Sequence, residues 1–345
     1  MSAEPAPKTG VLLINLGTPL APESGPVGTY LREFLGDPSV IDLPGPLRWL
    51  LVNCIIVPTR APKSAEAYQK VWTSQGSPLL VHSYGLRDAL AERLLQHPLD
   101  VGMRYGRPTI AGALERLKLR GCDRVVCFSL YPHAAESSTG TATRAVQEAA
   151  AQIDGLEVQV LPEYFDHPAW IEAVRAAAAS GMSEAPFDHV LFSFHGLPER
   201  HIEKADPGGL CLKSADCCEP LCEINRNCYK AQCLSSAKAI ADALGLEPDS
   251  WTSSFQSGLG RRWLLPSTEK TLVSLAESGV RKLTVLTPGF SADCLETIEE
   301  LGMRGAELFK EAGGEELRVL PCLNANPVWV EALASMLEPH LADGT

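Results

Sequence analysis

Four short apolar runs, each rich in strand-forming residues and each ending in small or polar residues, recur along the whole chain. They are VLLINLGTP (11–19), RVVCFSLYPH (124–133), HVLFSFHG (189–196) and KLTVLTPGF (282–290). Near-continuous apolar runs without alternation are typical of strands that are buried on both faces of a parallel sheet. Segments with helical periodicity alternate with these runs. The pattern therefore predicts an α/β protein with two doubly wound parallel-sheet halves.

The length of the chain also suits two domains, because 345 residues can bury two hydrophobic cores. The segment PEYFDHP interrupts the strand–helix pattern near residues 162–168. We expect an N-terminal half at 1–162, a C-terminal half at 163–326 and a final helix at 327–345 that packs back onto either half. Open α/β sheets bind ligands beyond the carboxyl ends of their strands, so the ends of the four runs should frame the cleft.

Charge and hydropathy exclude some classes of function. The net charge of −12 argues against a nucleic-acid partner, which needs a basic surface. The longest apolar stretch, LRWLLVNCIIVP (47–58), is too short to span a bilayer and is interrupted by polar residues. It is expected to be a buried helix; the alternative is an apolar lip that contacts a membrane peripherally, and this lip would expose Trp49 and Leu50. The N-terminus lacks a signal-like pattern, so we expect a cytoplasmic protein.

The third apolar run ends in a histidine that is a candidate for catalysis. His195 precedes Gly196, which allows the chain to turn sharply. Imidazole titrates near neutral pH, so a histidine that faces the cleft can accept a proton or bind a metal. The alternative is a histidine that is satisfied by the backbone at the end of a strand.

Acidic residues follow the fourth run, in the segment PGFSADCLETIEE (288–300). A helix is predicted to begin near Asp293. Glu296 and Glu300 are four residues apart and so share a helix face, which is slightly destabilising unless a cation or a proton relay uses both charges. The alternative is structural, because the helix dipole favours acidic residues in a first turn and Asp293 alone could cap the helix.

Seven segments follow one another between residues 10 and 301 in the order found in ferrochelatases, and the chain resembles that family. They are GVLLINLGTP, TYLREFLGDPSVIDLP, GSPLL, MRYGRPTI, LYPHAAESSTG, FSFHGLPER and PGFSADCLETIEEL. The resemblance implies a lyase of the metal-chelatase type that inserts ferrous iron into protoporphyrin IX, the terminal step of heme biosynthesis. It also implies that the two halves are Rossmann-like, chelatase-type domains enclosing a porphyrin cleft.

The resemblance assigns roles to particular residues. His195 and Glu296 match the central metal-site pair of the family, and neutral imidazole and carboxylate are suitable acceptors for pyrrole protons. Asp293 and Glu300 would form an acidic relay behind them. The positions that resemble porphyrin-binding residues are Leu16, Arg60, Tyr68, Ser77, Arg104, Tyr105, Ser257 and Phe290. Of these, Arg60, Tyr68, Ser77 and Ser257 resemble the positions that meet the propionates. An aliphatic residue at position 16 is similar to members that use protoporphyrin rather than coproporphyrin.

Some of these assignments have simple structural alternatives. Arg60 could be a solvated surface arginine, and Ser77 and Ser257 could be ordinary turn serines. Phe290, which follows a Pro-Gly pair, could equally be a core residue.

Six of the eleven cysteines lie in one short insert, residues 208–233. Its spacings lack the paired C-x2-C knuckles that zinc sites prefer, whereas four thiolates with irregular spacing can hold a [2Fe–2S] cluster. Some ferrochelatases resemble this chain in carrying such a cluster on an internal segment. We expect Cys211, Cys218, Cys228 and Cys233 as ligands. Cys217 is the main substitute. Cys233 lies in a segment, YKAQC, that resembles one in relatives without a cluster; if Cys233 is therefore not a ligand, Cys222 takes its place.

Other functions remain open from the residues alone. The chain could be a non-catalytic tetrapyrrole or metal carrier, or an iron–sulfur regulatory protein that has lost activity. It could also be a chelatase for another metal, such as cobalt for sirohydrochlorin, or for another porphyrin, coproporphyrin III. His195 and Glu296 favour an enzyme, because a carrier does not need a proton acceptor opposite an acidic relay.

Overall fold

The structure is a computed structural model that describes residues 8–206, 208–214, 216–258, 260 and 262–342. The chain forms two compact units. Unit 1 comprises Met1–Leu130, Ser137–Pro162 and Val330–Thr345, and unit 2 comprises Tyr131–Glu136 and Glu163–Trp329. Each unit is described by itself below.

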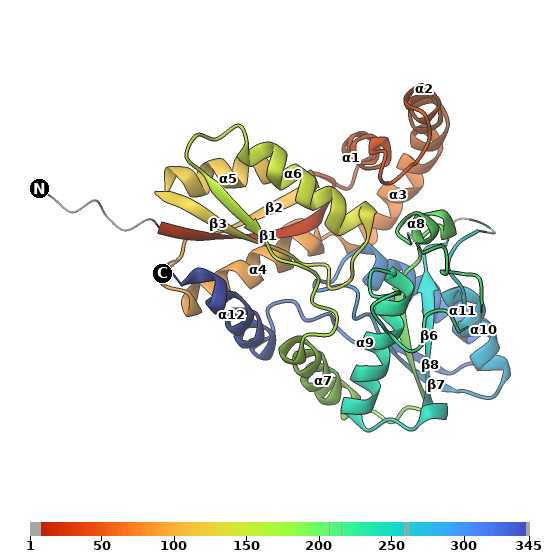
Figure 1. Ribbon diagram of the computed structural model, residues 1–345. Helices are drawn as coiled ribbons and strands as arrows, with labels where there is room; N and C mark the ends of the chain where they lie inside the picture. Colours follow the sequence, from red (N-terminus) through yellow and green to blue (C-terminus); the bar gives the residue numbers. More distant parts are fainter. Residues whose placement is uncertain (1–7, 207, 215, 259, 261, 343–345) are drawn as a thin grey trace, which may run out of the picture. The chain divides into compact units, whose positions relative to one another are not determined.

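Unit 1 is built on a sheet of four parallel strands in the order β2-β1-β3-β4 (Figure 1). The strands are β1 Lys8–Thr18, β2 Leu99–Gly106, β3 Cys122–Ser129 and β4 Glu157–Val160. The central strand β1 is fully buried from Val11 to Ile14. This burial on both faces explains why the run reads as continuously apolar rather than alternating.

Helices cover both faces of this sheet. In Figure 1, α5 and α6 lie on one side of the strands and α4 lies on the other. The helices of this part of the chain are α1 Ser24–Gly36, α2 Gly45–Leu50, α3 Val57–Val71, α4 Pro78–Arg93, α5 Ile110–Leu119 and α6 Thr141–Ala150, with π-helical segments η1 Leu51–Ile56 and η2 Glu136–Gly140.

Unit 2 repeats the same plan with the strand order β6-β5-β7-β8, again all parallel. Its strands are β5 His189–His195, β6 Trp251–Gln256, β7 Lys282–Leu286 and β8 Glu316–Val319. The two sheets have no obvious sequence repeat, yet they share one topology. The predicted α/β class with two parallel-sheet halves is thereby confirmed.

Helices also cover both faces of the second sheet. Figure 1 shows α7 and α9 on one side and α10 and α11 on the other. A core cluster that includes Leu272, Val285 and Phe309 fills the space under α10 and α11. The helices are α7 Pro168–Met182, α8 Glu199–Lys204, α9 Tyr229–Leu244, the 3₁₀ turn η3 Pro248–Ser250, α10 Thr268–Glu277, the π-helix η4 Glu296–Gly305 and α11 Ala306–Glu311.

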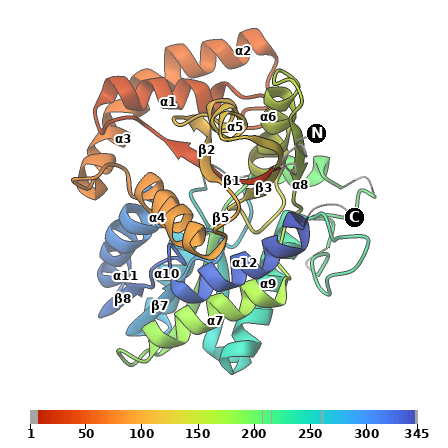
Figure 2. The same ribbon diagram turned by 90° about the vertical axis from the view of Figure 1, so that its left-hand side faces the viewer.

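The apolar stretch 47–58 forms α2, η1 and the start of α3, and it does not form the buried helix that the sequence predicted. Trp49 is 62% exposed, and Leu50 is 50% exposed. Figures 1 and 2 both show α2 at the outer side of unit 1, away from the sheet. No helix within the described residues is long and apolar enough to cross a membrane.

The last helix, α12 Pro327–Leu341, belongs to unit 1 from Val330 onward. Arg93 of α4 makes an ion pair with Glu331, with 2.6 Å between Nε and Oε1. Arg124 Nη1 of β3 donates to the carbonyl oxygen of His340 at 2.8 Å. These contacts fasten the C-terminal helix to the first sheet.

Candidate active site

The sheet of unit 2 has its topological switch point at the carboxyl ends of β5 and β7. The chain runs from the central strand β5 to β6 on one side and then returns to β7 on the other. Connections that leave in opposite directions open a crevice at this point, where α/β sheets bind ligands. His195 is the last residue of β5, and Phe290 lies in the loop after β7 with its ring centroid 6.5 Å from that of His195.

The hydrogen bond made by His195 defines its neutral tautomer. His195 Nδ1 lies 2.7 Å from the carbonyl oxygen of Gly196. A carbonyl oxygen only accepts, so Nδ1 carries the proton and Nε2 carries the lone pair when the ring is neutral. The Tyr229 hydroxyl donates to the carbonyl oxygen of His195 at 2.8 Å and fixes the strand end. The residue is therefore prepared to accept a proton or a metal at Nε2.

Gly196 and Gln256 join the end of β5 to its neighbours. The Gly196 amide donates to Gln256 O at 2.7 Å, and a Cβ at position 196 would lie 2.7 Å from that same oxygen, so only glycine fits. Gln256 is fully buried; its Oε1 accepts from Ser193 Oγ at 2.8 Å, and its Nε2 donates to Glu296 O at 3.3 Å. One side chain thus ties β5 to the start of η4.

Glu296 and Glu300 lie on a π-helix rather than on the predicted α-helix. π-Helical hydrogen bonds join residues five apart, and such segments are rare and frequent at functional sites. Burial raises the pKa of Glu300, and the negative charge of Glu296 raises it further, whereas the hydrogen bonds from Ser257 and the positive charges of His195 and Arg304 lower it. The net pKa is raised, and Glu296, His195 and Arg304 are the charged neighbours that act on the Glu300 carboxylate.

Asp293 has several partners within unit 2. Its carboxylate accepts from Asn324 Nδ2 at 2.7 Å, from Thr297 Oγ1 at 3.1 Å and from the amide of Cys322 at 3.2 Å. The Asp293 amide in turn donates to Asn324 Oδ1 at 2.9 Å. These bonds tie the loop before η4 to the segment after β8. None of them is made with a backbone amide of η4, whose N-cap is Leu295, so they do not make Asp293 a cap of that helix.

Phe290 is half-buried, and its surroundings include apolar side chains. Together with residues such as Val174 and Leu320 it lines a cavity of about 30 Å³. The ring therefore contacts the core on one side and His195 on the other. This position is compatible with porphyrin binding and with a role in the core, the two roles considered for Phe290.

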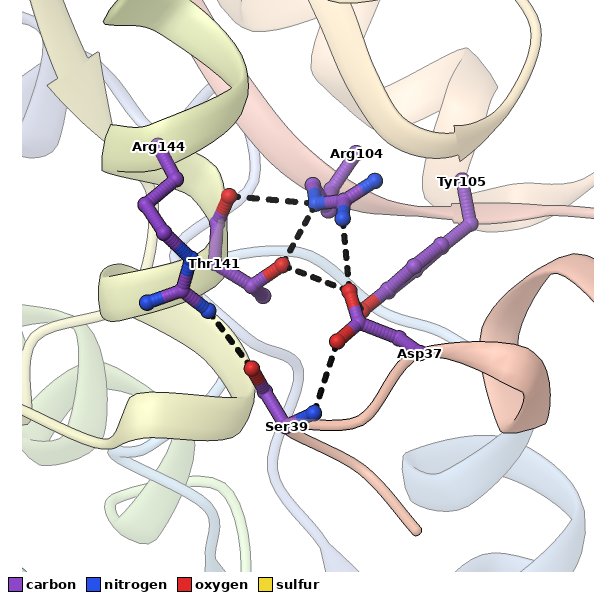
Figure 3. Close-up of polar contacts among 6 residues, drawn as sticks. All are labelled: Asp37, Ser39, Arg104, Tyr105, Thr141 and Arg144. Atoms are coloured by element: carbon purple, nitrogen blue, oxygen red, sulfur yellow. Dashed lines mark hydrogen bonds and ion pairs between the residues drawn. The ribbon is translucent and has the colours of Figure 1, made fainter. Parts of the chain in front are cut away.

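Arg104 and Tyr105, at the end of β2, belong to a polar network centred on Asp37 (Figure 3). Arg104 Nη2 donates to Asp37 Oδ2 at 2.6 Å, and the Tyr105 hydroxyl donates to the same oxygen at 3.0 Å. Thr141 Oγ1 donates to it at 2.8 Å, and the Ser39 amide donates to Oδ1 at 2.7 Å. The network holds the guanidinium of Arg104 in one orientation.

Asp37 is expected to contribute strongly to stability. Burial raises its pKa, but the hydrogen bonds from Ser39, Thr141 and Tyr105 and the charge of Arg104 outweigh burial, so the net pKa is lowered. We expect Asp37→Ala to lower the free energy of unfolding by about 2–4 kcal/mol, because it leaves a partly buried guanidinium without its carboxylate. Urea denaturation at pH 7 measures this loss.

The pH dependence of stability provides a second measurement for Asp37. A lowered folded-state pKa means that the contribution is present above about pH 3.9, the unfolded value, and is lost as the pH falls through the folded value. The difference between wild type and Asp37→Ala should therefore shrink in strong acid. Asp88→Ala, which removes an exposed carboxylate paired with Arg87, is the control. Equal losses for both variants at pH 7 would contradict the role of Asp37.

The remaining predicted porphyrin-binding residues of unit 1 differ in exposure. Leu16 is half-buried at the end of β1, and Arg60 is exposed on α3. Tyr68 is 8% exposed and packs edge-on against Trp72, and Ser77 is 3% exposed and accepts from Thr18 Oγ1 at 2.7 Å. Leu16 lies near the carboxyl end of β1 and Arg104 near that of β2, whereas Ser77 directly precedes α4.

The cysteine-rich insert gathers most of its sulfur atoms between α8 and α9. Cys211, Cys218 and Cys228 are each at most 5% exposed, and Cys217 Sγ lies 3.6 Å from Cys218 Sγ. Hydrogen bonding from the Cys218 thiol is the largest influence on Cys228, and with the backbone amides at the start of α9 and the Cys211 thiol it lowers the pKa of Cys228 to about 6 despite burial.

The other two cysteines of the insert differ in exposure. Cys222 is exposed, and Cys233 is fully buried within α9, where its thiol interacts with Tyr229. A pocket of about 290 Å³ reaches Cys211 and Cys228. Among the residues that the structure describes, no group of three or more His, Cys, Asp or Glu side chains is arranged around a single metal ion.

Comparison with known proteins decides the family. A family model described as ferrochelatase matches residues 8–341. The chain belongs to the ferrochelatase family. Among curated relatives, a ferrochelatase of Ectopseudomonas mendocina is 47% identical over 331 residues, covering 95% of this chain and 97% of the relative. A ferrochelatase of Azotobacter vinelandii is also 47% identical, covering 94% of this chain and 97% of the relative.

Solved structures share the fold of this ferrochelatase-family chain at low sequence identity. SirB from Bacillus subtilis with Fe3+ superposes with a TM-score of 0.54 at 11% identity, covering 97% of this chain and 96% of SirB. The sirohydrochlorin chelatase SirB from Bacillus subtilis subspecies spizizenii in complex with cobalt superposes with a TM-score of 0.55 at 9% identity. The match covers 97% of this chain and 95% of that SirB chain. These similarities show that the fold is the two-domain fold of chelatases.

Sequence reasoning missed several residues that organise the candidate site. Gln256 and Tyr229 hold the end of β5, and their partners are distant in sequence. Glu299 is 3% exposed and pairs with Arg304, with 2.9 Å between Oε2 and Nε. Cys294, next to Asp293, is buried, and burial is the first cause of its strongly raised pKa, with the Glu296 carboxylate adding to it. The only sequence signal for Glu299 and Cys294 was their position within the segment PGFSADCLETIEEL, which also contains Glu296.

Proposed function

We propose that this protein inserts ferrous iron into protoporphyrin IX to form protoheme, with His195 and Glu296 at the reacting centre. As a member of the ferrochelatase family it is a metal chelatase that inserts iron into a porphyrin for heme synthesis. The observation that supports the residue assignment is the position of His195 at the switch point of unit 2, with Nε2 available as an acceptor and with His195 and Glu296 as charged neighbours of Glu300.

The reaction requires two proton acceptors. A free porphyrin has two pyrrole N–H groups, and entry of Fe2+ releases both protons while the four nitrogens bind the metal. No oxidation state changes. We propose that His195 Nε2 takes one pyrrole proton and that Glu296 accepts the other, whether or not it also delivers iron. Glu300 lies four residues after Glu296 on η4 and would pass protons onward, with Asp293 just before this helix.

Further residues are proposed to bind the porphyrin. Arg60, Tyr68 and Ser77 are proposed to meet the propionates, for which hydroxyl and guanidinium donors are suitable. Arg104, held by Asp37, and Tyr105 are proposed near the macrocycle, and so is Phe290. Buckling the porphyrin ring exposes its nitrogen lone pairs to the metal but strains the ring. Contacts remote from the reacting centre can offset this strain.

Leu16 supports the choice of protoporphyrin IX over coproporphyrin III. Protoporphyrin has two vinyl groups where coproporphyrin has two further propionates. A half-buried aliphatic side chain at the end of β1 is a better neighbour for an apolar substituent than for a carboxylate. Anaerobic conversion of protoporphyrin IX to protoheme by the purified protein tests the proposed function.

The insert is proposed to hold a [2Fe–2S] cluster. Its donor set fits, because Cys211, Cys218 and Cys228 are buried together and Cys217 adjoins Cys218. Such a cluster takes two thiolates on each iron, so four ligand sulfurs need not surround one point. We propose these three cysteines as ligands, with Cys233 or Cys217 as the fourth and Cys222 as a further candidate. When bound, the cluster would cross-link the insert and make it sensitive to oxidation.

We also propose that α2 and η1 contact an anionic membrane surface peripherally. Leu47, Trp49, Leu50 and Ile55 are each at least 50% exposed. Residues 43–63 contain two arginines and one lysine but no acidic residue, although the whole chain has a net charge of −12. Tryptophan prefers the membrane interface, and basic residues are attracted to anionic lipids. A cytoplasmic location of the protein remains a prediction.

Substitution of two exposed apolar residues tests this contact. We expect Trp49→Ser with Leu50→Ser to weaken binding to phosphatidylglycerol vesicles about tenfold or more, because each residue loses its burial in the interface. Vesicle cosedimentation measures the effect. Leu119→Ser is the control, because Leu119 is 86% exposed elsewhere in unit 1. Wild-type protein that does not bind these vesicles, or equal losses in both variants, would contradict the proposal.

A further inference from the structure

Ser257 adopts a backbone conformation that serine rarely takes. It directly follows β6 and has φ of 61°, in the left-handed region that favours glycine. This conformation costs free energy, so it persists only where the surrounding contacts compensate. The contacts that compensate are made with Glu300, which is 43 residues away in sequence.

Both donors of Ser257 are directed at the Glu300 carboxylate. The Ser257 amide donates to Glu300 Oε1 at 2.8 Å. The hydroxyl lies 3.0 Å from Oε1 and 2.8 Å from Oε2. A hydroxyl has only one proton, so in this arrangement Ser257 cannot also donate to a porphyrin propionate. The Ser257 hydroxyl is therefore already engaged with Glu300 and is not free to bind a substrate carboxylate.

Glu300 needs such support, because its carboxylate is only 16% exposed and lies near the negative charge of Glu296. The Arg304 guanidinium is 4.0 Å away and also pairs with Glu299, so it holds Glu300 only loosely. Ser257 makes the shorter contacts with Glu300, and these favour its ionised form. Without them the Glu300 side chain would gain freedom to turn away from Glu296.

We propose that Ser257 is a positioning residue that holds the Glu300 carboxylate in line with Glu296 and His195, rather than a ligand of a porphyrin propionate. The inference rests on the proposed function of the His195–Glu296 pair. It assigns to the left-handed turn after β6 the role of fixing the Glu300 carboxylate of η4. Loss of the hydroxyl should therefore slow the reaction and leave porphyrin binding almost unchanged.

The test compares Ser257→Gly in two backgrounds. Glycine accepts the left-handed φ and keeps the amide donor, so the fold should be retained while the hydroxyl is lost. We expect kcat to fall about tenfold with KM for protoporphyrin IX changed less than about twofold. In a Glu300→Gln background the same change should cost less than about twofold in kcat, because the group on which Ser257 acts is already altered. Ser253→Ala, on the same strand, is the control.

A porphyrin with esterified propionates separates the two roles of Ser257. If Ser257 positions Glu300, Ser257→Gly lowers kcat to the same extent with protoporphyrin IX and with its dimethyl ester. A rise in KM for the free acid alone, with kcat unchanged, would overturn the inference and support a propionate contact. Glu296→Gln is measured in parallel. If it has full activity, the proposed site fails and the inference fails with it; if it is inactive while Ser257→Gly is fully active, only the inference fails.

Discussion

His195→Ala should lower kcat for iron insertion by about 100- to 10,000-fold, the range that a positioned proton acceptor contributes. The variant loses the Nε2 acceptor, whose lone pair is fixed by the bond between Nδ1 and Gly196 O. No propionate-binding residue is altered, so the affinity for porphyrin should change little. Anaerobic initial rates, together with porphyrin binding followed by fluorescence quenching, measure both quantities.

A second histidine variant controls for nonspecific effects of the His195 substitution. His167→Ala removes an exposed histidine that caps α7 in the same unit, accepting from the Ala169 amide at 3.2 Å. It should cost some stability but leave kcat within about twofold of wild type, since loss of a cap costs only about 1 kcal/mol. Iron insertion by His195→Ala at the wild-type rate would exclude this residue as the acceptor.

Cys218→Ser and Cys228→Ser should each remove the cluster. The purified wild-type protein should be reddish, show visible charge-transfer absorption and contain about two irons per chain before any porphyrin is added. Each variant should lose the absorption and nearly all of the iron, because serine oxygen is a poor substitute for a buried thiolate ligand. Iron analysis and absorption spectra after anaerobic purification provide readouts that do not depend on chelatase activity.

Three further variants identify the fourth cluster ligand, and one serves as a control. Cys217→Ser, Cys222→Ser and Cys233→Ser compete for this role, and only one of them should behave like Cys228→Ser. Cys54→Ser, on the exposed face of η1, should keep the full iron content. Colourless wild-type protein that carries stoichiometric zinc after anaerobic preparation would contradict the cluster proposal.

The sheets could be predicted from sequence because their signal is local. Val11–Ile14 and Val190–Phe192 are continuously apolar for the same reason that they lie in central strands, namely burial on both faces. His195 could be chosen because strand ends carry ligands in this class of fold. The class of fold therefore followed from adjacent residues, and the same local pattern made His195 a candidate.

Other features depend on partners that are distant in sequence. The change from α- to π-helix at Glu296–Gly305 alters hydrogen bonding by one residue and leaves no periodic signature in a short segment. Ser257 was expected to meet a propionate, but its left-handed turn and its bonds to Glu300 depend on η4 packing beside β6. Gln256 is likewise explained only by its contacts with Ser193 and Glu296.

The exposed stretch 47–58 illustrates a limit of inference from base rates. Apolar helices are usually buried, and the sequence around Trp49 and Leu50 carries no signal that distinguishes a core helix from a surface one. The structure exposes both residues because α2 stands away from the sheet of unit 1 (Figures 1 and 2). Only the absence of acidic residues between 43 and 63 hinted at an anionic partner.

The central claim is that this protein inserts ferrous iron into protoporphyrin IX rather than only binding the porphyrin. The most direct measurement is anaerobic incubation of purified wild-type protein with Fe2+ and protoporphyrin IX, with coproporphyrin III and cobalt in parallel arms. We predict catalytic formation of protoheme, detected by its pyridine hemochrome spectrum, with protoporphyrin IX preferred over coproporphyrin III. Stoichiometric porphyrin binding without metal insertion, under conditions that preserve the native iron content, would contradict the account and favour a carrier.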